Sequence, residues 1–242
     1  MEKRYVMVID LRRCVGCQAC TIACQQENNV HITAFRAWVK QVEKGTYPNV
    51  RKLALPVLCN QCERPICVQN CPVQATYQRD DGIVLIDYDR CIGCKYCIAS
   101  CPYDVRFVNP VRKVVEKCTF CAHRVDRGDQ PACVETCMPK ARIFGDLNDP
   151  GSEATKIINT QPVVVLKPES GTNPQVFYVF PDRFAMETHG TDPQYIRYYH
   201  RAMNEEISLS EEDIKERHKI LAGVSRADRF YDYRIDSNRP IR

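Results

Sequence analysis

The sequence predicts an α+β protein in which a cysteine-bearing unit occurs twice and is followed by a long segment without cysteine. Three features of the chain support this prediction. All sixteen cysteines of the 242 residues lie between Cys14 and Cys137. The cysteines fall into four groups of four, and the residues around the groups repeat. We therefore read the chain as a duplicated two-motif unit with a cysteine-free C-terminal extension.

Two cysteine spacings alternate along the chain. Groups one and three have the spacing C-x2-C-x2-C-x3-C, called type one: Cys14, Cys17, Cys20 and Cys24, then Cys91, Cys94, Cys97 and Cys101. Groups two and four, called type two, have four or eleven residues before the third cysteine: Cys59, Cys62, Cys67 and Cys71, then Cys118, Cys121, Cys133 and Cys137. The flanks match as well, since 8–14 (VIDLRRC) resembles 85–91 (LIDYDRC) and 65–68 (PICV) resembles 131–134 (PACV).

Short strands and helices are predicted around these groups. The apolar runs 5–9 and 83–86 are typical of strands that lead into each type-one loop. Gly16 and Gly93 permit a tight turn inside the loops, and short helices are expected to begin within 21–24 and 98–101.

The cysteine-free segment also has predicted elements. Strands are expected at 163–166 and 176–180, around a Pro/Gly turn. Residues 210–213 (SEED) favour the start of a polar helix that ends near Gly223. The run 228–234 mixes aromatic residues with arginines, a composition favoured at interfaces; a solvated tail is the alternative.

The grouping of the cysteines favours iron–sulfur clusters over two alternatives. A disulfide scaffold is typically small and secreted, whereas this chain is long. Zinc ribbons use two CxxC pairs per metal rather than a triplet. A [4Fe–4S] cube has four corner irons, each binding one soft thiolate, so sixteen cysteines predict four clusters. In two-cluster ferredoxins the fourth cysteine of a group binds the neighbouring cluster.

The charge does not indicate nucleic-acid binding. The formal net charge is +4, but sixteen thiolates and four cluster cores bring it to about −4. Lys95 and Lys117 lie in or beside cysteine groups and are expected to offset cluster charge.

Membrane spans and export signals are not predicted. No apolar run approaches the roughly 18–20 residues of a spanning helix. The first apolar run breaks at Asp10, and Arg12-Arg13 is followed at once by Cys14 rather than by an apolar stretch.

The cysteine groups resemble a known family. Residues 118–124 (CTFCAHR), 131–137 (PACVETC), 145–150 (GDLNDP) and 166–172 (LKPESGT) are similar to the iron–sulfur subunits of the dimethyl-sulfoxide-reductase (molybdopterin oxidoreductase) family. Within it, the polysulfide, thiosulfate and tetrathionate reductase subunits are the most similar. The resemblance covers residues 1 to about 180.

The resemblance implies two ferredoxin-like 2×[4Fe–4S] folds related by pseudo-twofold symmetry. The first holds groups one and four, in 1–55 plus 102–145; the second holds groups two and three, in 56–101. Residues 146–242 are then a C-terminal extension with partner contacts. Spacing alone also allows groups one with two and three with four.

The resemblance also implies that the last cysteine of each group binds the cluster of the partner group. We call the four implied ligand sets A to D: set A is Cys14, Cys17, Cys20 and Cys137; set B is Cys24, Cys118, Cys121 and Cys133; set C is Cys59, Cys62, Cys67 and Cys101; set D is Cys71, Cys91, Cys94 and Cys97.

The implied function is electron transfer without catalysis, because four thiolates per cluster leave no iron open to substrate. The implied partners are a molybdopterin-containing catalytic subunit and a membrane anchor with a quinone site. Sulfur compounds are the first substrate expected for the complex; arsenate, dimethyl sulfoxide and the reverse reaction stay open.

We expect a membrane-associated complex on the periplasmic face, reached by co-export with a partner, with the cytoplasmic face as alternative. A free-standing polyferredoxin and a zinc-rich structural module are the competing interpretations.

Overall fold

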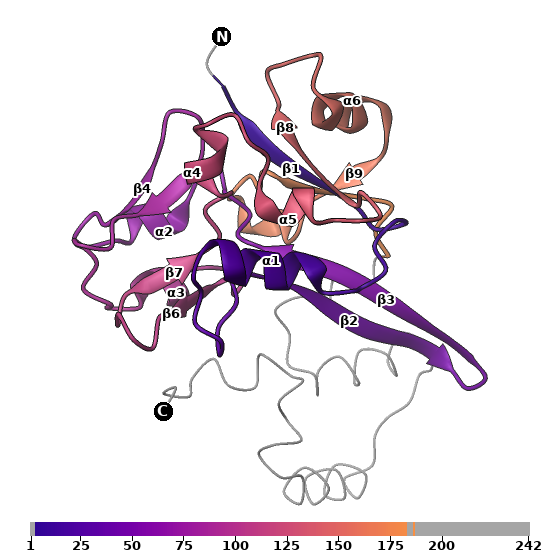
Figure 1. Cartoon of the computed structure of the whole chain (residues 1–242), viewed down its shortest axis with the longest axis horizontal. Coiled ribbons are helices and arrows are strands. Elements are labelled where there is room, and N and C mark those ends of the chain that lie inside the picture. Colours follow the sequence, from indigo (N-terminus) through magenta and orange to yellow (C-terminus); the bar gives the residue numbers. More distant parts are fainter. Residues whose placement is uncertain (1–2, 183–185, 187–242) are drawn as a thin grey trace, which may run out of the picture. The chain divides into compact units, whose positions relative to one another are not determined.

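A four-stranded sheet joins the beginning of the chain to segments far along the sequence (Figure 1). The computed structural model describes residues 3–182 and Met186. Strand β1 (Tyr5–Asp10) pairs antiparallel with β8 (Arg142–Asp146) and parallel with β10 (Val176–Val179). Strand β9 (Val163–Val164) pairs antiparallel with β10 and ends the sheet. The continuous apolar run of β1 is fully buried from Val6 to Ile9, as expected for a central strand.

The remaining strands of the described residues form three two-stranded hairpins. In chain order they are β2 (Ala37–Thr46) with β3 (Asn49–Leu58), β4 (Thr76–Gln78) with β5 (Val84–Ile86), and β6 (Arg106–Val108) with β7 (Val115–Lys117). The β2–β3 hairpin is the longest and projects from the elements around it (Figure 1). Its base is buried, with Leu55, Val57 and Leu58 at 0% exposure, whereas Tyr47 at its tip is 90% exposed.

The helices of the described residues are short, and some of them pack in pairs. They are α1 (Ala19–Glu27), α2 (Ile66–Gln69), α3 (Tyr96–Ala99), α4 (Ala122–Val125), α5 (Ala132–Glu135), α6 (Glu153–Thr160) and the 3-10 helix η1 (Pro168–Ser170). Helix α1 packs against α5, and α2 packs against α3, while α6 covers β8 and β1. Helices that carry cysteines of groups one and four are thus neighbours, as are those of groups two and three.

The order of elements repeats along the chain. Each strand that leads into a type-one group pairs antiparallel with a strand that follows a type-two group, β1 with β8 and β5 with β4. Each type-one group is followed by a hairpin that leads to a type-two group, β2–β3 and then β6–β7. The α+β class is therefore confirmed. The twofold relation between two folds and the boundaries 1–55 plus 102–145, 56–101 and 146–242 stay predictions.

Most predicted elements within the described residues are present, with shifted ends. The strands expected at 5–9, 83–86, 163–166 and 176–180 are β1, β5, β9 and β10. The helices expected to begin within 21–24 and 98–101 begin earlier, at Ala19 and Tyr96, because the left-handed residues Gln18 and Lys95 end the loops there. The predicted helix at 210–223 and the run 228–234 lie outside the described residues.

Candidate iron–sulfur centres

Left-handed backbone shapes the two type-one loops. Gly16 and Gly93 have φ of 70° and 65°, and a Cβ at Gly93 would lie 2.4 Å from the carbonyl oxygen of Lys113. A side chain at this position would therefore both strain the backbone and collide with it. Each helix then starts one residue before the third cysteine, so Cys20 and Cys97 lie in the first turns of α1 and α3.

Thiols of groups one and four are neighbours. The thiol of Cys14 lies within electrostatic range of Cys137, although 123 positions separate them in the numbering. Cys24, on α1, lies within electrostatic range of Cys133 and Cys121, and Asn28 Nδ2 lies 3.7 Å from Cys24 Sγ and 3.9 Å from Cys121 Sγ. These neighbours agree with sets A and B. That each of these thiols binds iron stays a prediction.

Thiols of groups two and three are neighbours in the same way. All four members of set C, Cys59, Cys62, Cys67 and Cys101, line a single cavity. In set D, Cys97 lies within electrostatic range of Cys91. The spatial pairing of groups one with four and two with three therefore agrees with the pairing that the family resemblance implies.

Burial of the thiols depends on the group. Cys118, Cys121 and Cys133 of group four are buried, whereas Cys17 and Cys94, the second cysteines of the two type-one groups, are exposed. Burial and the neighbouring Cys133 and Cys121 raise the pKa of Cys24 to about 12. Burial also raises the pKa of Cys133 to about 11. Such thiols are protonated at neutral pH until a metal displaces the proton, so cluster binding releases protons.

Cys71 differs from the other thiols. Although partial burial raises its pKa, backbone N–H donors outweigh this, and the pKa lies below its ordinary value. The N–H groups of Ala75 and Thr76 donate to Cys71 Sγ at 3.2 and 3.5 Å. Hydrogen bonds to the sulfur favour the thiolate, which is the form that binds metal.

Unpartnered polar atoms occur in buried side chains beside the cysteine groups. Both side-chain polar atoms of Asn60, which lines the set C cavity, are buried without a hydrogen-bond partner. The same holds for Arg106 Nη1 and for Arg142 Nε and Nη2. Buried polar groups normally have partners, and the sulfides of a cubane are acceptors. The soft thiol ligands and these donors therefore fit a bound [4Fe–4S] cluster.

Comparison with known proteins gives the family. Residues 50–147 match the family described as 4Fe–4S dicluster domain. One subunit of the tetrathionate reductase of Salmonella typhimurium is 51% identical over 180 residues, which are 73% of this chain and 72% of that protein. One chain of the polysulfide reductase of Wolinella succinogenes is 42% identical over 195 residues, 78% of this chain and 100% of that protein. The iron–sulfur subunit of the arsenate respiratory reductase of Shewanella sp. is 35% identical over 224 residues, 73% of this chain and 96% of that protein.

The chain belongs to the family of reductase iron–sulfur subunits. The predictions of [4Fe–4S] clusters and of a role in electron transport are confirmed by this membership. The number of clusters stays a prediction.

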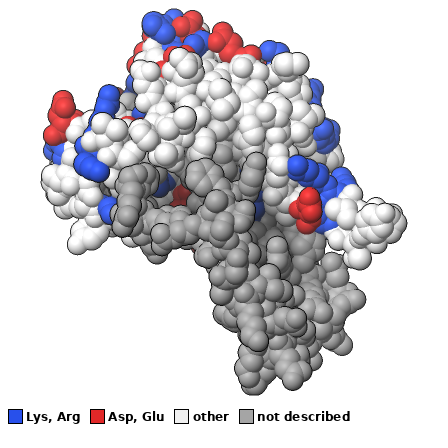
Figure 2. All heavy atoms as spheres, turned by 60° about the horizontal axis from the view of Figure 1, so that its bottom comes forward, with Lys and Arg blue, Asp and Glu red and all other residues white. Residues whose placement is uncertain are grey.

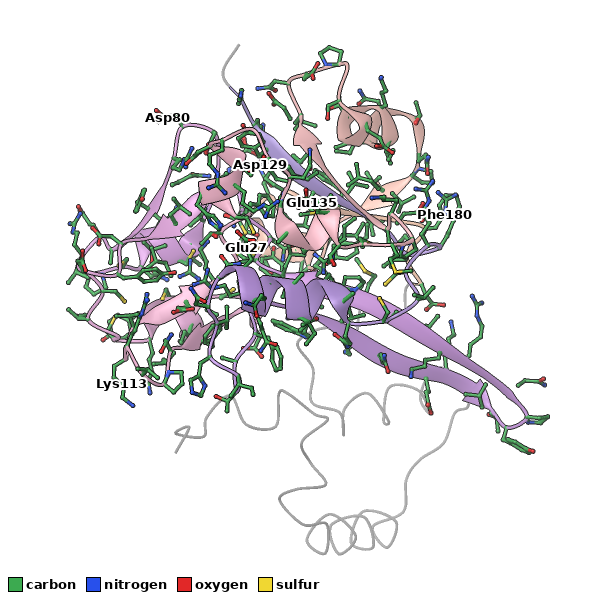
Figure 3. The ribbon with its side chains drawn as sticks, viewed as in Figure 1. Glu27, Asp80, Lys113, Asp129, Glu135 and Phe180 are labelled. Atoms are coloured by element: carbon green, nitrogen blue, oxygen red, sulfur yellow. The ribbon has the colours of Figure 1, made fainter. Side chains whose placement is uncertain are left out.

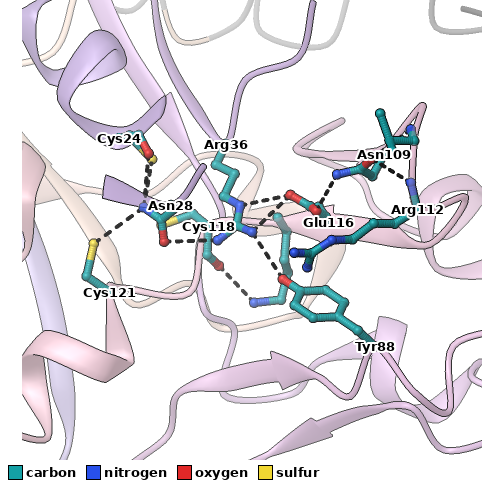
Figure 4. A network of polar contacts seen from close by, with 11 residues as sticks. Cys24, Asn28, Arg36, Tyr88, Asn109, Arg112, Glu116, Cys118 and Cys121 are labelled. Carbon is teal, nitrogen blue, oxygen red and sulfur yellow. Dashed lines mark hydrogen bonds and ion pairs between the residues drawn. The ribbon is translucent and has the colours of Figure 1, made fainter. Parts of the chain in front are cut away.

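The iron–sulfur subunit contains a buried polar network beside set B (Figure 4). The Arg36 guanidinium donates to Glu116 Oε2 at 2.9 Å, to Asn28 Oδ1 at 3.0 Å and to the Tyr88 hydroxyl at 3.2 Å. Asn109 Nδ2 donates to the other Glu116 oxygen at 2.7 Å. Because the buried charges of Arg36 and Glu116 are paired and bonded, the network adds no net charge beside the cluster ligands.

A second set of contacts, at the surface, joins the helices that carry groups one and four. Arg124, on α4, donates to Glu27 on α1 at 3.0 Å and also to Glu135 on α5; Figure 3 shows both acidic residues. His123 bonds Glu27 at 2.7 Å and is 47% exposed at its side chain. His123 is therefore a surface residue that contacts a carboxylate.

Within the described residues, three buried basic side chains lie close to thiols. Lys117 is fully buried and donates to the carbonyls of Val84 and Cys118, the latter at 2.9 Å. Lys117 thus lies beside the cysteine groups, although burial lowers its pKa, whereas Lys95 is exposed at the surface. That either lysine offsets cluster charge stays a prediction. Arg106 and Arg142 were not predicted from the sequence. The signal that could have found them is their spacing, since each is the fifth residue after the last cysteine of a group, Cys101 and Cys137.

Two further features concern membranes and single metal ions. Among residues 3–182 and Met186, no helix has the length and apolar character to cross a membrane. In that same part of the chain, no three His, Cys, Asp or Glu side chains are placed to hold one metal ion together.

Proposed function

We propose that the chain binds four [4Fe–4S] clusters through sets A to D and relays electrons within a membrane-associated reductase complex. The observation that carries this proposal is the closeness of thiols in successive ligand sets. Thiols of adjacent sets are electrostatic neighbours at three places: Cys20 with Cys133, Cys118 with Cys59, and Cys67 with Cys97. These neighbours support the linear order A, B, C, D. Bound clusters of this kind supply one-electron transfer.

The two ends of this order lie at the surface. Cys17 of set A and Cys94 of set D are exposed, and so are the apolar neighbours Val15 (73%) and Ile92 (65%). The inner sets B and C draw on buried thiols, including Cys118 and Cys59. The chain thus offers one site for electron entry and one for exit, while its fold keeps water from the middle of the relay.

The partners proposed are a molybdopterin-containing catalytic subunit and a membrane anchor with a quinone site. Similarity to the tetrathionate and polysulfide reductase chains supports a sulfur compound as the substrate of the complex. We place the complex on the extracytoplasmic face of the membrane, reached by co-export with the catalytic subunit.

Anaerobic purification from the native source tests the proposal. We expect about sixteen irons per chain, visible absorption, and a large molybdenum-containing subunit identified by mass spectrometry. A chain that migrates alone would favour the free-standing polyferredoxin. A colourless holoprotein would eliminate the cluster assignment itself, and fractionation of periplasm and cytoplasm tests the location.

A further inference from the structure

Two buried arginines follow cysteine groups at the same spacing. Arg106 is the first residue of β6 and Arg142 the first residue of β8, each five positions after the last cysteine of a group. They are 5% and 2% exposed. A guanidinium so deeply buried is unusual, because removing its charge from water costs free energy unless an opposite charge lies nearby.

Arg106 lies between sets C and D. Its Nη2 atom donates to Cys67 Sγ at 2.7 Å, and its other thiol neighbours include Cys59 and Cys101 of set C and Cys97 of set D. The Arg106 side chain also lines the set C cavity.

Arg142 lies between sets A and B in the same manner. Its Nη1 atom donates to Cys133 Sγ at 3.9 Å, and its charge also reaches Cys118 of set B and Cys20 of set A. Both arginines thus stand at a junction between two successive ligand sets.

These arginines differ from Arg36 in what balances their charge. Arg36 is paired with the buried carboxylate of Glu116. Among the ion pairs of the described residues, neither Arg106 nor Arg142 has a carboxylate partner. The negative charge available to them is that of the cysteine sulfurs, and each has a buried nitrogen without a hydrogen-bond acceptor.

We propose that Arg106 and Arg142 are positioning residues for electron transfer, permanent buried cations that raise the reduction potentials of the clusters on either side of them. This inference rests on the proposed function, since it assumes clusters in sets A to D. Reduction adds one electron to a bound cluster, with no bond formed and no proton moved. A nearby cation stabilises the more negative, reduced form, so the potential rises. Arginine suits this role because its guanidinium stays protonated throughout the physiological pH range.

A second consequence concerns neighbouring clusters. Two adjacent reduced clusters repel one another, and a cation at their junction lowers that repulsion. The pair Arg106 and Arg142 therefore acts locally, Arg106 on sets C and D and Arg142 on sets A and B.

The test is a redox titration of the anaerobically purified holoprotein complex, followed by EPR. Cys17→Ser and Cys94→Ser variants assign the signals of sets A and D. For Arg142→Met we expect at least about a tenfold rise in the oxidised-to-reduced ratio of sets A and B at a fixed poise, which is about 59 mV for one electron. Sets C and D should keep their potentials. For Arg106→Met we expect the same rise at sets C and D, while sets A and B should keep their potentials.

Matched controls are Arg13→Met and Arg90→Met, which remove exposed arginines that directly precede Cys14 and Cys91. Because water screens an exposed charge, we expect the oxidised-to-reduced ratio of every set to change by less than about threefold. Unchanged potentials in a fully loaded Arg142→Met protein would overturn the proposal, as would an equal shift of all four sets. Absence of cluster signals in the parent protein would instead refute the proposed function, before any variant is made.

The lysine variants decide the case in which a methionine variant loses its clusters. Arg106→Lys and Arg142→Lys keep the positive charge, so these variants should retain iron. Their oxidised-to-reduced ratios should stay within about tenfold of those of the unsubstituted protein. Lysine variants that also lack clusters would overturn the proposal, because charge would then not be the property that matters.

Discussion

Cys24 belongs to group one by sequence, yet its thiol neighbours belong to group four. It lies on α1, which packs against the α5 helix that carries Cys133. We therefore expect Cys24→Ser to disrupt the set B cluster and to leave set A intact, because a serine oxygen is a poor substitute for a soft thiolate. Iron content and the EPR spectrum measure this loss, and Cys17→Ser serves as the control that affects set A. If the two variants changed the same signal, groups one and four would not exchange their last cysteines.

At the residue scale, the sequence predicted the side chains whose roles depend on local spacing. Sixteen cysteines and the turn glycines Gly16 and Gly93 are recognisable because cluster loops are made by residues close together in the chain. Arg106 and Arg36 were not predicted, since nothing in a single arginine tells whether the fold will bury it. Their burial follows from contacts across 39 and 80 positions, to Cys67 and to Glu116.

At the element scale, strands and helices were predictable where the apolar pattern is local, but pairing was not. The parallel pairing of β1 with β10 joins Met7 to Val176, and only the completed core selects that register. The long β2–β3 hairpin was likewise unforeseen, because its outer part, 43–52, is mostly polar and shows no alternation of apolar and polar residues. Exposed basic side chains, Lys44, Arg51 and Lys52, gather on it (Figure 2).

The outer half of this hairpin is expected to be dispensable for cluster binding. Replacing residues 43–52 by an Asn-Gly turn keeps the Val42–Leu53 pair and removes side chains that are exposed throughout. The lost ion pair of Lys44 with Asp182, at 3.2 Å, is exposed and contributes about 1 kcal/mol at most. We expect unchanged iron content and a shift of less than about 4 °C in the midpoint of anaerobic thermal bleaching.

Leu55→Ala is the matched control at the base of the same hairpin. Leu55 is fully buried, so its truncation should cost about 2–5 kcal/mol of stability. The bleaching midpoint should fall several times further than in the variant with the shortened hairpin. A hairpin deletion that destabilised the protein as much as Leu55→Ala would show that the tip takes part in the fold.

At the scale of the whole molecule, the cysteine-free segment divides into two parts. Strands β9 and β10 belong to the sheet of β1 and β8, so residues up to Val179 complete the fold around the clusters. Val176, Tyr178 and Val179 are fully buried, and the Tyr178 hydroxyl donates to the carbonyl of Pro56 at 2.9 Å. Burial of each such side chain contributes about 1.5–3 kcal/mol, a large share of the stability of a typical domain.

Two truncations should therefore behave differently. A chain that ends after Thr172 lacks β10, exposes Met7 and Ile9, and is expected to lose its clusters. A chain that ends after His189, where the compact unit that holds the described residues ends, keeps every cysteine and the whole sheet, and should retain its full iron content. If residues 190–242 supply partner contacts, as the aromatic and arginine-rich run 228–234 indicates, this longer chain will hold iron yet fail to co-purify with the catalytic subunit. Co-purification of the 1–189 chain at the level of the intact protein would place those contacts within the cluster-binding part instead.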